Sequence, residues 1–290
     1  MEGSRDEQSK RSSVRYGKKK WTEQAHHTWQ VDGKELVNLA DGSQVSWMNI
    51  ADEGTGSHLK ADVHSCKRVS QIELQQGVAS VNQAFERWGL PECIKIDNGQ
   101  PFVSPRYRDV PTKAKLWWIG LGIKVIQNPP RLPQENGIVE CLQGTCCRWT
   151  NPNSCTNVEE LQKALDETSD FQRNHYEIPA LKNKTRKELY PDLALNPRKY
   201  NPNNFDINKV HEYLSKKVWQ RKATSIGRIS FFGENIHIGR PFSGVEIFIT
   251  FDPIEKQWIF RNKKGLLLKT SSTAVPQNED FKEFTIISKN

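Results

Sequence analysis

Residues 94–102 read IKIDNGQPF and residues 129–140 read PPRLPQENGIVE. In the first stretch Asp97 follows a short alternation of apolar residues, which predicts that it lies at the exit of a buried strand. In the second stretch Glu140 follows a proline-rich loop and an Asn-Gly pair, which predicts that it lies in the first turn of a helix. Another carboxylate, Asp32, stands upstream within the strand-like run WQVDGKELVNLA.

Carboxylates held by strands and a helix can converge on divalent cations. Mg²⁺ and Mn²⁺ are hard cations that prefer carboxylates together with phosphate and water. Asp32, Asp97 and Glu140 are therefore predicted to be catalytic and to hold a pair of such ions, as in two-metal phosphoryl transfer. Each acid alone also has a structural explanation, because Asp-Asn-Gly is a common turn and an acid near a helix N-terminus favours the helix dipole. Glu135 competes with Glu140, although it lies in the loop, so the prediction depends on all the acids occurring together.

The pattern around these acids predicts an α/β core. Short turns join strand-like segments between residues 28 and 64, which predicts an antiparallel meander. Apolar residues then recur at helical spacing over 71–89, so the strand over 93–97 should run parallel to the first strand through a right-handed crossover. The remaining predicted elements are a helix over 112–120, a strand over 123–127 and helices over 137–149 and 158–175. The order βββαβαβαα predicts a mixed five-stranded sheet with flanking helices.

The second half of the chain has a different pattern. Residues 179–222 form a connection rich in Pro, Asn and Lys, with a short strand or helix expected near 210–218. Five short strands separated by turn residues follow over 228–269, which predicts a small barrel of the SH3-like kind. The predicted units are a disordered basic N-terminal segment, a catalytic core, a basic linker, a barrel and a tail, bounded by 1–27, 28–178, 179–222, 223–270 and 271–290.

Charge is distributed unevenly along the chain. Residues 29–180 carry 15 Lys and Arg against 19 Asp and Glu, whereas residues 181–269 carry 18 against 8. This distribution suits a metal-dependent nucleic-acid enzyme, because carboxylates hold cations while basic flanks neutralise phosphate. No apolar run approaches the roughly 20 residues of a membrane span, and the N-terminus has no apolar signal-peptide core. The six cysteines show no CxxC spacing, which predicts reduced thiols in a cytoplasmic protein.

The quoted motifs together resemble a known family. WQVD, IKIDNGQPF and PPRLPQENGIVE look like the catalytic core shared by retroviral integrases and many bacterial insertion-sequence transposases, the DDE superfamily. The resemblance covers about residues 28–190. It continues into RISFFGENIHIGRPFSGVEIFITFD, which is similar to the barrel-type C-terminal domain of bacterial members.

The resemblance implies an RNase H-like fold and metal-dependent DNA cleavage and strand transfer, as in DNA integration and transposition. Asp32, Asp97 and Glu140 match the metal-binding carboxylates of that family, and Gln134 and Asn136 match the loop that lies beside the DNA. Double-stranded DNA, comprising element ends and target, is the implied partner. The chain is expected to act as a homo-oligomer on that DNA, in the cytoplasm and at the nucleoid of a bacterium.

Basic residues of the linker and barrel are the candidates for phosphate contacts. The foremost are Lys216, Lys217, Arg221, Lys222 and Arg240, with Lys182, Lys184, Arg186 and Lys187 beside them. Binding through such contacts should weaken steeply as salt rises.

The sequence departs from the family in ways that leave alternatives open. The interval from Asp97 to Glu140 is longer than in retroviral members, and the chain has little sequence before the core, where bacterial members carry a helix-turn-helix region. One alternative is a metal-dependent nuclease that cuts DNA without joining it. The other is a truncated or domesticated transposase that only binds DNA.

Overall fold

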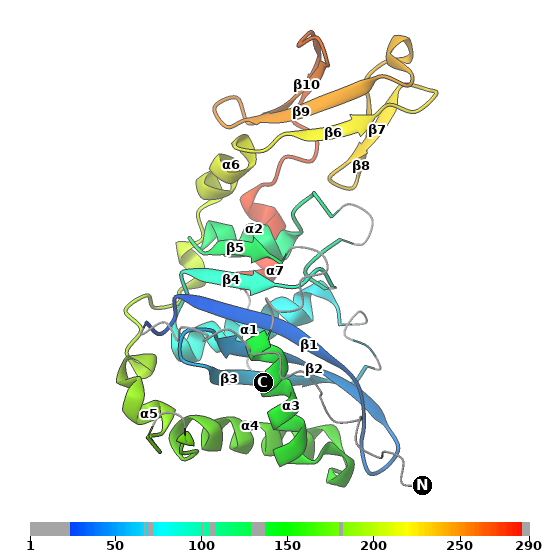
Figure 1. The fold of residues 1–290 in the computed structure, drawn as a ribbon. Helices are drawn as coiled ribbons and strands as arrows, with labels where there is room; N and C mark the ends of the chain where they lie inside the picture. Colours follow the sequence, from blue (N-terminus) through cyan, green and yellow to red (C-terminus); the bar gives the residue numbers. More distant parts are fainter. Residues whose placement is uncertain are drawn as a thin grey trace, which may run out of the picture.

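The computed structural model describes residues 24–66, 68, 72–99, 101–104, 108–128, 137–179 and 182–285. Residues 28–174 form a layered α/β core, and residues 219–271 form a smaller β structure beyond one end of it (Figure 1). The elements of the core are β1 (Thr28–Asn38), β2 (Gln44–Asp52), β3 (Ser57–His64), α1 (Leu74–Trp88), β4 (Cys93–Ile96), α2 (Lys113–Gly120), β5 (Lys124–Gln127), α3 (Gly137–Thr150), η3 (Pro152–Ser154) and α4 (Val158–Asn174).

The core sheet is mixed and has the strand order β3-β2-β1-β4-β5. β1, β2 and β3 pair antiparallel, whereas β4 runs parallel to both β1 and β5. The predicted mixed five-stranded sheet with flanking helices is therefore confirmed. The register places β1 and β4 side by side at the centre of the sheet, with Val31 opposite Ile96.

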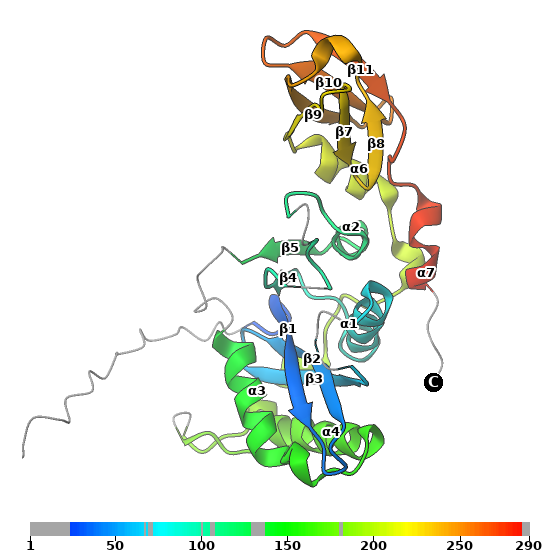
Figure 2. The same ribbon diagram turned by 90° about the vertical axis from the view of Figure 1, so that its right-hand side faces the viewer.

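Helices cover both faces of the sheet, with α1 on one side and α3 on the other (Figure 2). Successive side chains of a strand point to opposite faces. Trp29 of β1 accordingly packs on Phe85 of α1, with ring centroids 5.7 Å apart. Gln30, the next residue, accepts a hydrogen bond from the backbone of Val139 in α3 (3.0 Å). The even-numbered residues of this part of β1 therefore face α3.

The outer edge of β3 is covered by side chains of α4. Gln162 accepts a hydrogen bond from the backbone N–H of Val63 and donates one to the carbonyl of Ala61, each at 2.9 Å. Gln172 does the same with His58 N–H (3.1 Å) and the carbonyl of Gly56 (2.9 Å). Exposed strand edges invite pairing with other chains, so these glutamines complete the sheet on that side.

The second half contains more strands than the sequence predicted. Its elements are α5 (Arg186–Leu189), η5 (Pro191–Ala194), η6 (Pro202–Asn204), α6 (Ile207–Ser215), β6 (Trp219–Lys222), β7 (Arg228–Phe231), β8 (Glu234–His237), η7 (Arg240–Phe242), β9 (Glu246–Asp252), β10 (Gln257–Asn262), β11 (Leu267–Ser271), η8 (Asn278–Phe281) and α7 (Lys282–Thr285). β7 to β11 match the predicted strands, and β6 is additional. They form a four-stranded sheet, β11-β10-β9-β6, and a two-stranded sheet, β7-β8. A closed five-stranded SH3-like barrel is therefore not confirmed.

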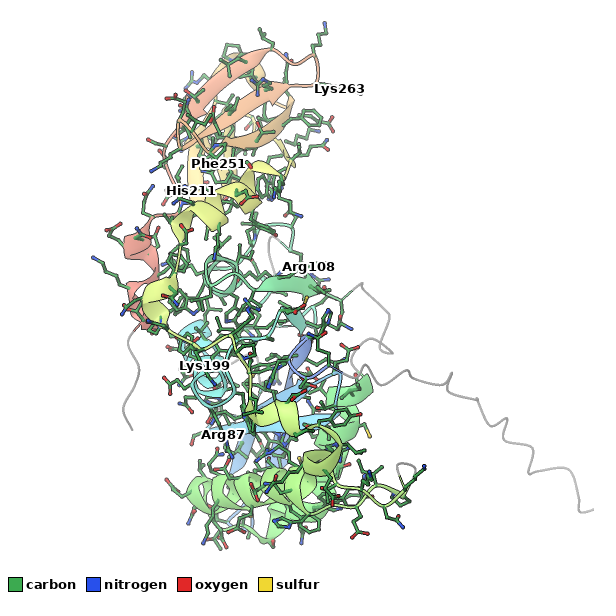
Figure 3. The ribbon with its side chains drawn as sticks, turned by 90° about the vertical axis from the view of Figure 1, so that its left-hand side faces the viewer. Arg87, Arg108, Lys199, His211, Phe251 and Lys263 are labelled. Carbon is green, nitrogen blue, oxygen red and sulfur yellow. The ribbon has the colours of Figure 1, made fainter. Side chains whose placement is uncertain are left out.

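Several contacts fasten the β structure to the core. Arg221 of β6 forms two hydrogen bonds to the Asp109 carboxylate, at 2.8 and 3.1 Å, and the Trp219 indole donates to the Asp109 carbonyl (3.0 Å). The ring of His211 in α6 packs at a tilt on the ring of Phe251 in β9, with ring centroids 5.2 Å apart (Figure 3). The last part of the segment predicted to be a linker, from α6 to β6, is thus packed between the two parts, whereas α5 packs on α4.

The segment predicted to be a tail returns to the core. Phe281 of η8 and Phe284 of α7 are 1% and 3% exposed. Phe284 packs on Trp117 of α2 (6.0 Å between centroids), and its carbonyl accepts a hydrogen bond from Asn82 of α1 (3.1 Å). Phe281 and Phe284 are spaced three apart and form one buried face of this segment. The segment was predicted to be a tail because most of its residues are polar.

The N-terminal prediction falls mostly outside the described residues, which begin at residue 24. His26, which the predicted disordered segment included, is buried. Its backbone N–H donates to Asp52 (2.7 Å), and its ring contacts the Leu193 carbonyl (2.8 Å). Among the helices that the structure describes, none has the length and apolarity needed to cross a membrane.

Candidate active site

Asp32 and Asp97 are brought together by the central pair of parallel strands. The β1–β4 register ends with Val31 opposite Ile96, so Asp32 and Asp97 are the next residues along their two chains. Neighbouring strands lie about 4.8 Å apart, and residues at the same register position point to the same face. The register therefore places these carboxylates side by side on the face that α3 covers.

Helix α3 carries Glu140 to the same face. Gln143, one turn further along α3, donates a hydrogen bond from Nε2 to Asp32 Oδ2 (2.9 Å). Residues spaced three apart share one side of a helix, so Glu140 and Gln143 belong to the side of α3 nearest Asp32. The bond between Val139 N–H and Gln30 fixes the first turn of α3 against β1. The Glu140 side chain is exposed at this end of the helix.

The pKa of Asp32 is affected by the charges of both Asp97 and Glu140. Its pKa is raised from 3.8 to about 6, first by burial and then by the charge of Asp97, with a smaller contribution from Glu140. Hydrogen bonds from the Gly33 backbone and from Gln143 act in the opposite direction. Like charges that cannot move apart disfavour each other's ionisation. A bound cation would therefore offset the repulsion between Asp32 and the other two carboxylates.

The Asp-Asn-Gly turn after β4 orients the Asp97 carboxylate. Gly99 N–H donates to Asp97 Oδ1 at 2.9 Å. A Cβ atom at Gly99 would lie 2.8 Å from Asp97 Oδ2, closer than such atoms approach in real structures. A larger residue at this position would therefore have to displace the Asp97 carboxylate.

The donor set fits a hard divalent cation in its chemistry, since it consists of carboxylate oxygens. Within the described part of the chain, however, no group of three or more His, Cys, Asp or Glu residues is already close enough to hold an ion. Asp32 and Asp97 are neighbours in the β1–β4 register, whereas the interaction of Glu140 with Asp32 is a repulsion between their charges. The predicted residues Gln134 and Asn136 lie outside the described residues.

The predicted phosphate-binding residues have different surroundings. Arg221 is engaged with Asp109, and Lys216 pairs with Glu212 at 2.6 Å. Lys217 lies over the Tyr213 ring, with its Nζ 5.2 Å from the ring centroid. Lys222 and Arg240 are exposed on the β structure. Lys263, which was not predicted, lies at the end of the β structure farthest from the core (Figure 3).

Sequence reasoning did not identify Gln30 or Gln143, which join β1 to α3. The available signal was spacing, because Gln30 stands two residues before Asp32 in a strand and Gln143 three residues after Glu140 in a helix. Amide side chains at these offsets share a face with the acids. They can therefore orient the carboxylates.

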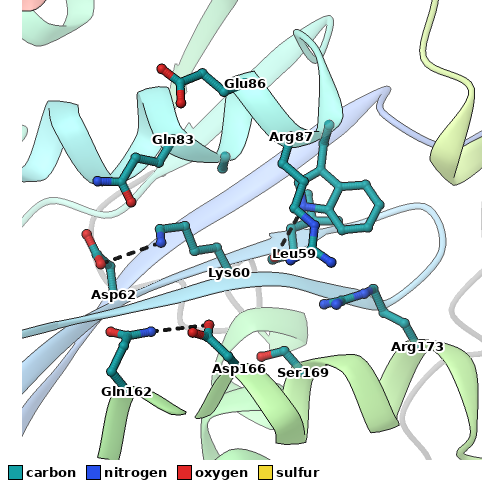
Figure 4. A pocket seen from close by; sticks show the side chains of 12 residues that line it. Leu59, Lys60, Asp62, Gln83, Glu86, Arg87, Gln162, Asp166, Ser169 and Arg173 are labelled. Carbon is teal, nitrogen blue, oxygen red and sulfur yellow. Dashed lines mark hydrogen bonds and ion pairs between the residues drawn. The ribbon is translucent and has the colours of Figure 1, made fainter. Parts of the chain in front are cut away.

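A separate pocket of about 510 Å³ lies between α1, β3 and α4 (Figure 4). The guanidinium carbons of Arg87 and Arg173 lie 4.8 and 5.1 Å from the ring centroid of Trp88. Lys60 and Asp62 face each other across 3.5 Å nearby. None of the three candidate catalytic acids lines this pocket, so it is distinct from the site on the α3 face.

Comparison with known proteins gives no match to any family model. Similar solved structures include the catalytic core domain of HTLV-2 integrase in complex with magnesium, with 19% identity and a TM-score of 0.41 over 57% of this chain and 96% of that one. The catalytic core domain of BIV integrase shows 18% identity and a TM-score of 0.40 over 58% and 95%. A simian T-cell lymphotropic virus intasome in complex with the PP2A regulatory subunit B56 gamma shows 17% identity and a TM-score of 0.45 over 85% and 79%. Values this low carry no information about activity, so function has to be inferred from the site itself.

Proposed function

We propose that this protein is a metal-dependent polynucleotidyl transferase that cuts DNA and joins the freed end to a target. The observation that supports this proposal most directly is the environment of Asp32. Asp97 lies beside it in register, Glu140 acts on it from α3, and its pKa is raised to about 6 by burial and by both acids. Carboxylates crowded in this way suit a site whose working state contains cations.

Asp32, Asp97 and Glu140 are the residues that would hold Mg²⁺ or Mn²⁺. Such ions, when bound, lower the pKa of an attacking hydroxyl and stabilise the leaving oxygen of a phosphodiester. The protein's own groups position the carboxylates: Gln143 holds Oδ2 of Asp32, and Gly99 N–H holds Oδ1 of Asp97. In the proposed reaction the attacking oxygen forms a new P–O bond in line with the P–O bond that breaks. The attacking hydroxyl loses its proton to solvent, and the leaving oxygen takes up a proton.

DNA is the proposed substrate because the second half of the chain is basic, with 18 Lys and Arg against 8 Asp and Glu over residues 181–269. Lys217, Lys222 and Arg240 remain the candidates for phosphate contacts, and salt-dependent affinity is expected from them. Arg221 is a weaker candidate, because its guanidinium already binds Asp109. We further propose that copies of the chain assemble on DNA, since joining two ends takes more than one active site.

A strand-transfer assay tests the proposal. The full chain is incubated with a pre-cut duplex end, a target duplex and Mn²⁺ or Mg²⁺, and joined products are separated from cut products. The wild-type protein should form joined products that Asp97→Asn does not form, while both bind DNA equally. The matched control is Glu167→Gln, which removes an exposed carboxylate on α4. Cutting without joining would show a nuclease instead, and binding without either would show that the chain is not an enzyme.

A further inference from the structure

A buried lysine lies at the start of a hydrogen-bonded chain that ends at the candidate site. Lys115 of α2 is 7% exposed. Its Nζ donates to Oε1 of Gln127 at the end of β5 (2.5 Å). Nε2 of Gln127 donates to Oδ1 of Asn98 (2.6 Å), and Nδ2 of Asn98 donates to the carbonyl of Asn128 (2.8 Å). Asn98 directly follows Asp97 in sequence.

This chain of bonds has a direction that both of its ends impose. A lysine ammonium only donates hydrogen bonds, and a backbone carbonyl only accepts them. Each amide between them has one donating and one accepting end, and the two can exchange by a flip. With Lys115 at one end and the Asn128 carbonyl at the other, only one orientation of Gln127 and Asn98 satisfies every bond.

Among the residues that the structure describes, no carboxylate contributes to the pKa of Lys115. Burial alone lowers its pKa from 10.5 to about 8. Burying a charged group without a carboxylate partner costs stability, so a structural role alone gives this position little reason to be a lysine. A lysine here provides an ammonium group that can only donate a hydrogen bond to Gln127.

We infer that Lys115 is a positioning residue that fixes the Asp97 carboxylate through Gln127 and Asn98. The inference rests on the proposed role of Asp97 in metal binding and adds residues that contact neither substrate nor metal. Asn98 is held on both sides of its amide, which fixes the backbone between Asp97 and Gly99. That backbone in turn supplies the N–H that holds Asp97 Oδ1. Groups outside the direct ligands of a metal typically change its affinity about 10- to 100-fold when they are removed.

The test uses the full chain and Mn²⁺ binding measured by titration calorimetry, without DNA. Lys115→Met keeps the aliphatic stem and removes the donor, so Mn²⁺ affinity should fall about 10-fold. Lys115→Gln retains a donating group and should recover part of that loss. The matched control is Lys113→Met on the same helix. The Lys113 side chain is half-exposed and its Nζ lies 3.8 Å from Glu283, so removing it should not change Mn²⁺ affinity.

Gln127→Glu separates positioning from stability. The new carboxylate would accept from Lys115 as an ion pair, which favours folding, but it could not donate to Asn98. Asn98 would then turn its donor toward Glu and its oxygen toward the Asn128 carbonyl. Mn²⁺ affinity should therefore fall about 10-fold while the melting temperature stays at or above that of the wild type. Side-chain amide signals of Asn98 in ¹⁵N spectra should shift in both Lys115→Met and Gln127→Glu.

The outcomes distinguish this inference from the proposed function. If Asp97→Asn abolishes Mn²⁺ binding while Lys115→Met and Gln127→Glu bind as tightly as the wild type, the positioning role is wrong and the active-site assignment stands. If Asp97→Asn itself binds Mn²⁺ normally, both are wrong. Loss in Gln127→Glu without loss of thermal stability supports the inference.

Discussion

Replacing Asp32 by Asn should make the protein more stable while removing its proposed activity. The pKa of Asp32 is raised from 3.8 to about 6 in the folded protein. A raised carboxyl pKa means that the folded state binds the proton more tightly than the unfolded state, so stability falls as pH rises between these values. At neutral pH the full penalty is present. A shift of about 2 units corresponds to roughly 3 kcal/mol, because each unit is worth about 1.4 kcal/mol.

Asparagine retains the shape of Asp32 and can still accept the hydrogen bond from Gln143. Asp32→Asn should therefore gain up to about 3 kcal/mol at pH 7, which is on the order of 5 °C in melting temperature for a protein of this size. The gain should shrink steadily as the pH is lowered from 6 to 4, where the wild-type carboxyl becomes protonated. Differential scanning calorimetry at several pH values, in buffer with a chelator, measures this dependence.

Two comparisons make the result decisive. Glu167→Gln removes an exposed carboxylate on α4 and should change stability by less than about 0.5 kcal/mol at any pH. Millimolar Mn²⁺ should raise the melting temperature of the wild type but not of Asp32→Asn, because a ligand stabilises only the state that binds it. If Asp32→Asn melts at or below the wild type at pH 7, the acids do not crowd one another and the reasoning fails.

Three further predictions concern the turn, the junction and the returning segment. Gly99→Ala should abolish Mn²⁺ binding in calorimetry, because its Cβ would lie 2.8 Å from Asp97 Oδ2 and would displace that carboxylate. Gly144→Ala, whose Cβ would lie 3.6 Å from Arg148, should instead stabilise α3 by about 1 kcal/mol. A double-mutant cycle of Asp109→Ala and Arg221→Ala should give a coupling energy of about 1 kcal/mol in urea unfolding, and additive effects would show that the pair does not fasten the β structure to the core. Phe281→Ala should lower the free energy of unfolding by about 3–5 kcal/mol, because Phe281 is 1% exposed. Ile254→Ala, at an 85% exposed position, should change it little. Equal melting temperatures of the two variants would mean that residues 278–285 do not pack on the core.

Local patterns predicted much of the core. Strand alternation and helical spacing placed β1 to β5 and α1 to α4 within a few residues of their observed bounds. Gly89, the last residue of the helix predicted over 71–89, has a φ of 78° and is the C-cap of α1. These signals are local, since a residue's period and its turn chemistry depend on its neighbours in sequence.

The segments that packing alone decides were predicted less well. The region 179–222 is polar in composition, yet Val210 and Leu214 of α6 are fully buried and connect the core with the β structure. Residues 278–285 return to α1 and α2, although their sequence resembles a tail. The six strands of the second half divide into two sheets, because strand pairing depends on partners far apart in the chain.

By itself, the sequence determined which residues carry carboxylates and which kind of element holds each: Asp32 in a strand, Asp97 at the end of another, and Glu140 in a helix. Only the tertiary structure decided that β1 and β4 are neighbours in register, that Gln143 rather than a charged group holds Asp32, and that a buried lysine in α2 directs the amides beside Asp97. The physical reason is that secondary structure follows from the period of a short segment. A pKa, in contrast, depends on which charges and donors the fold brings within a few ångströms of one another.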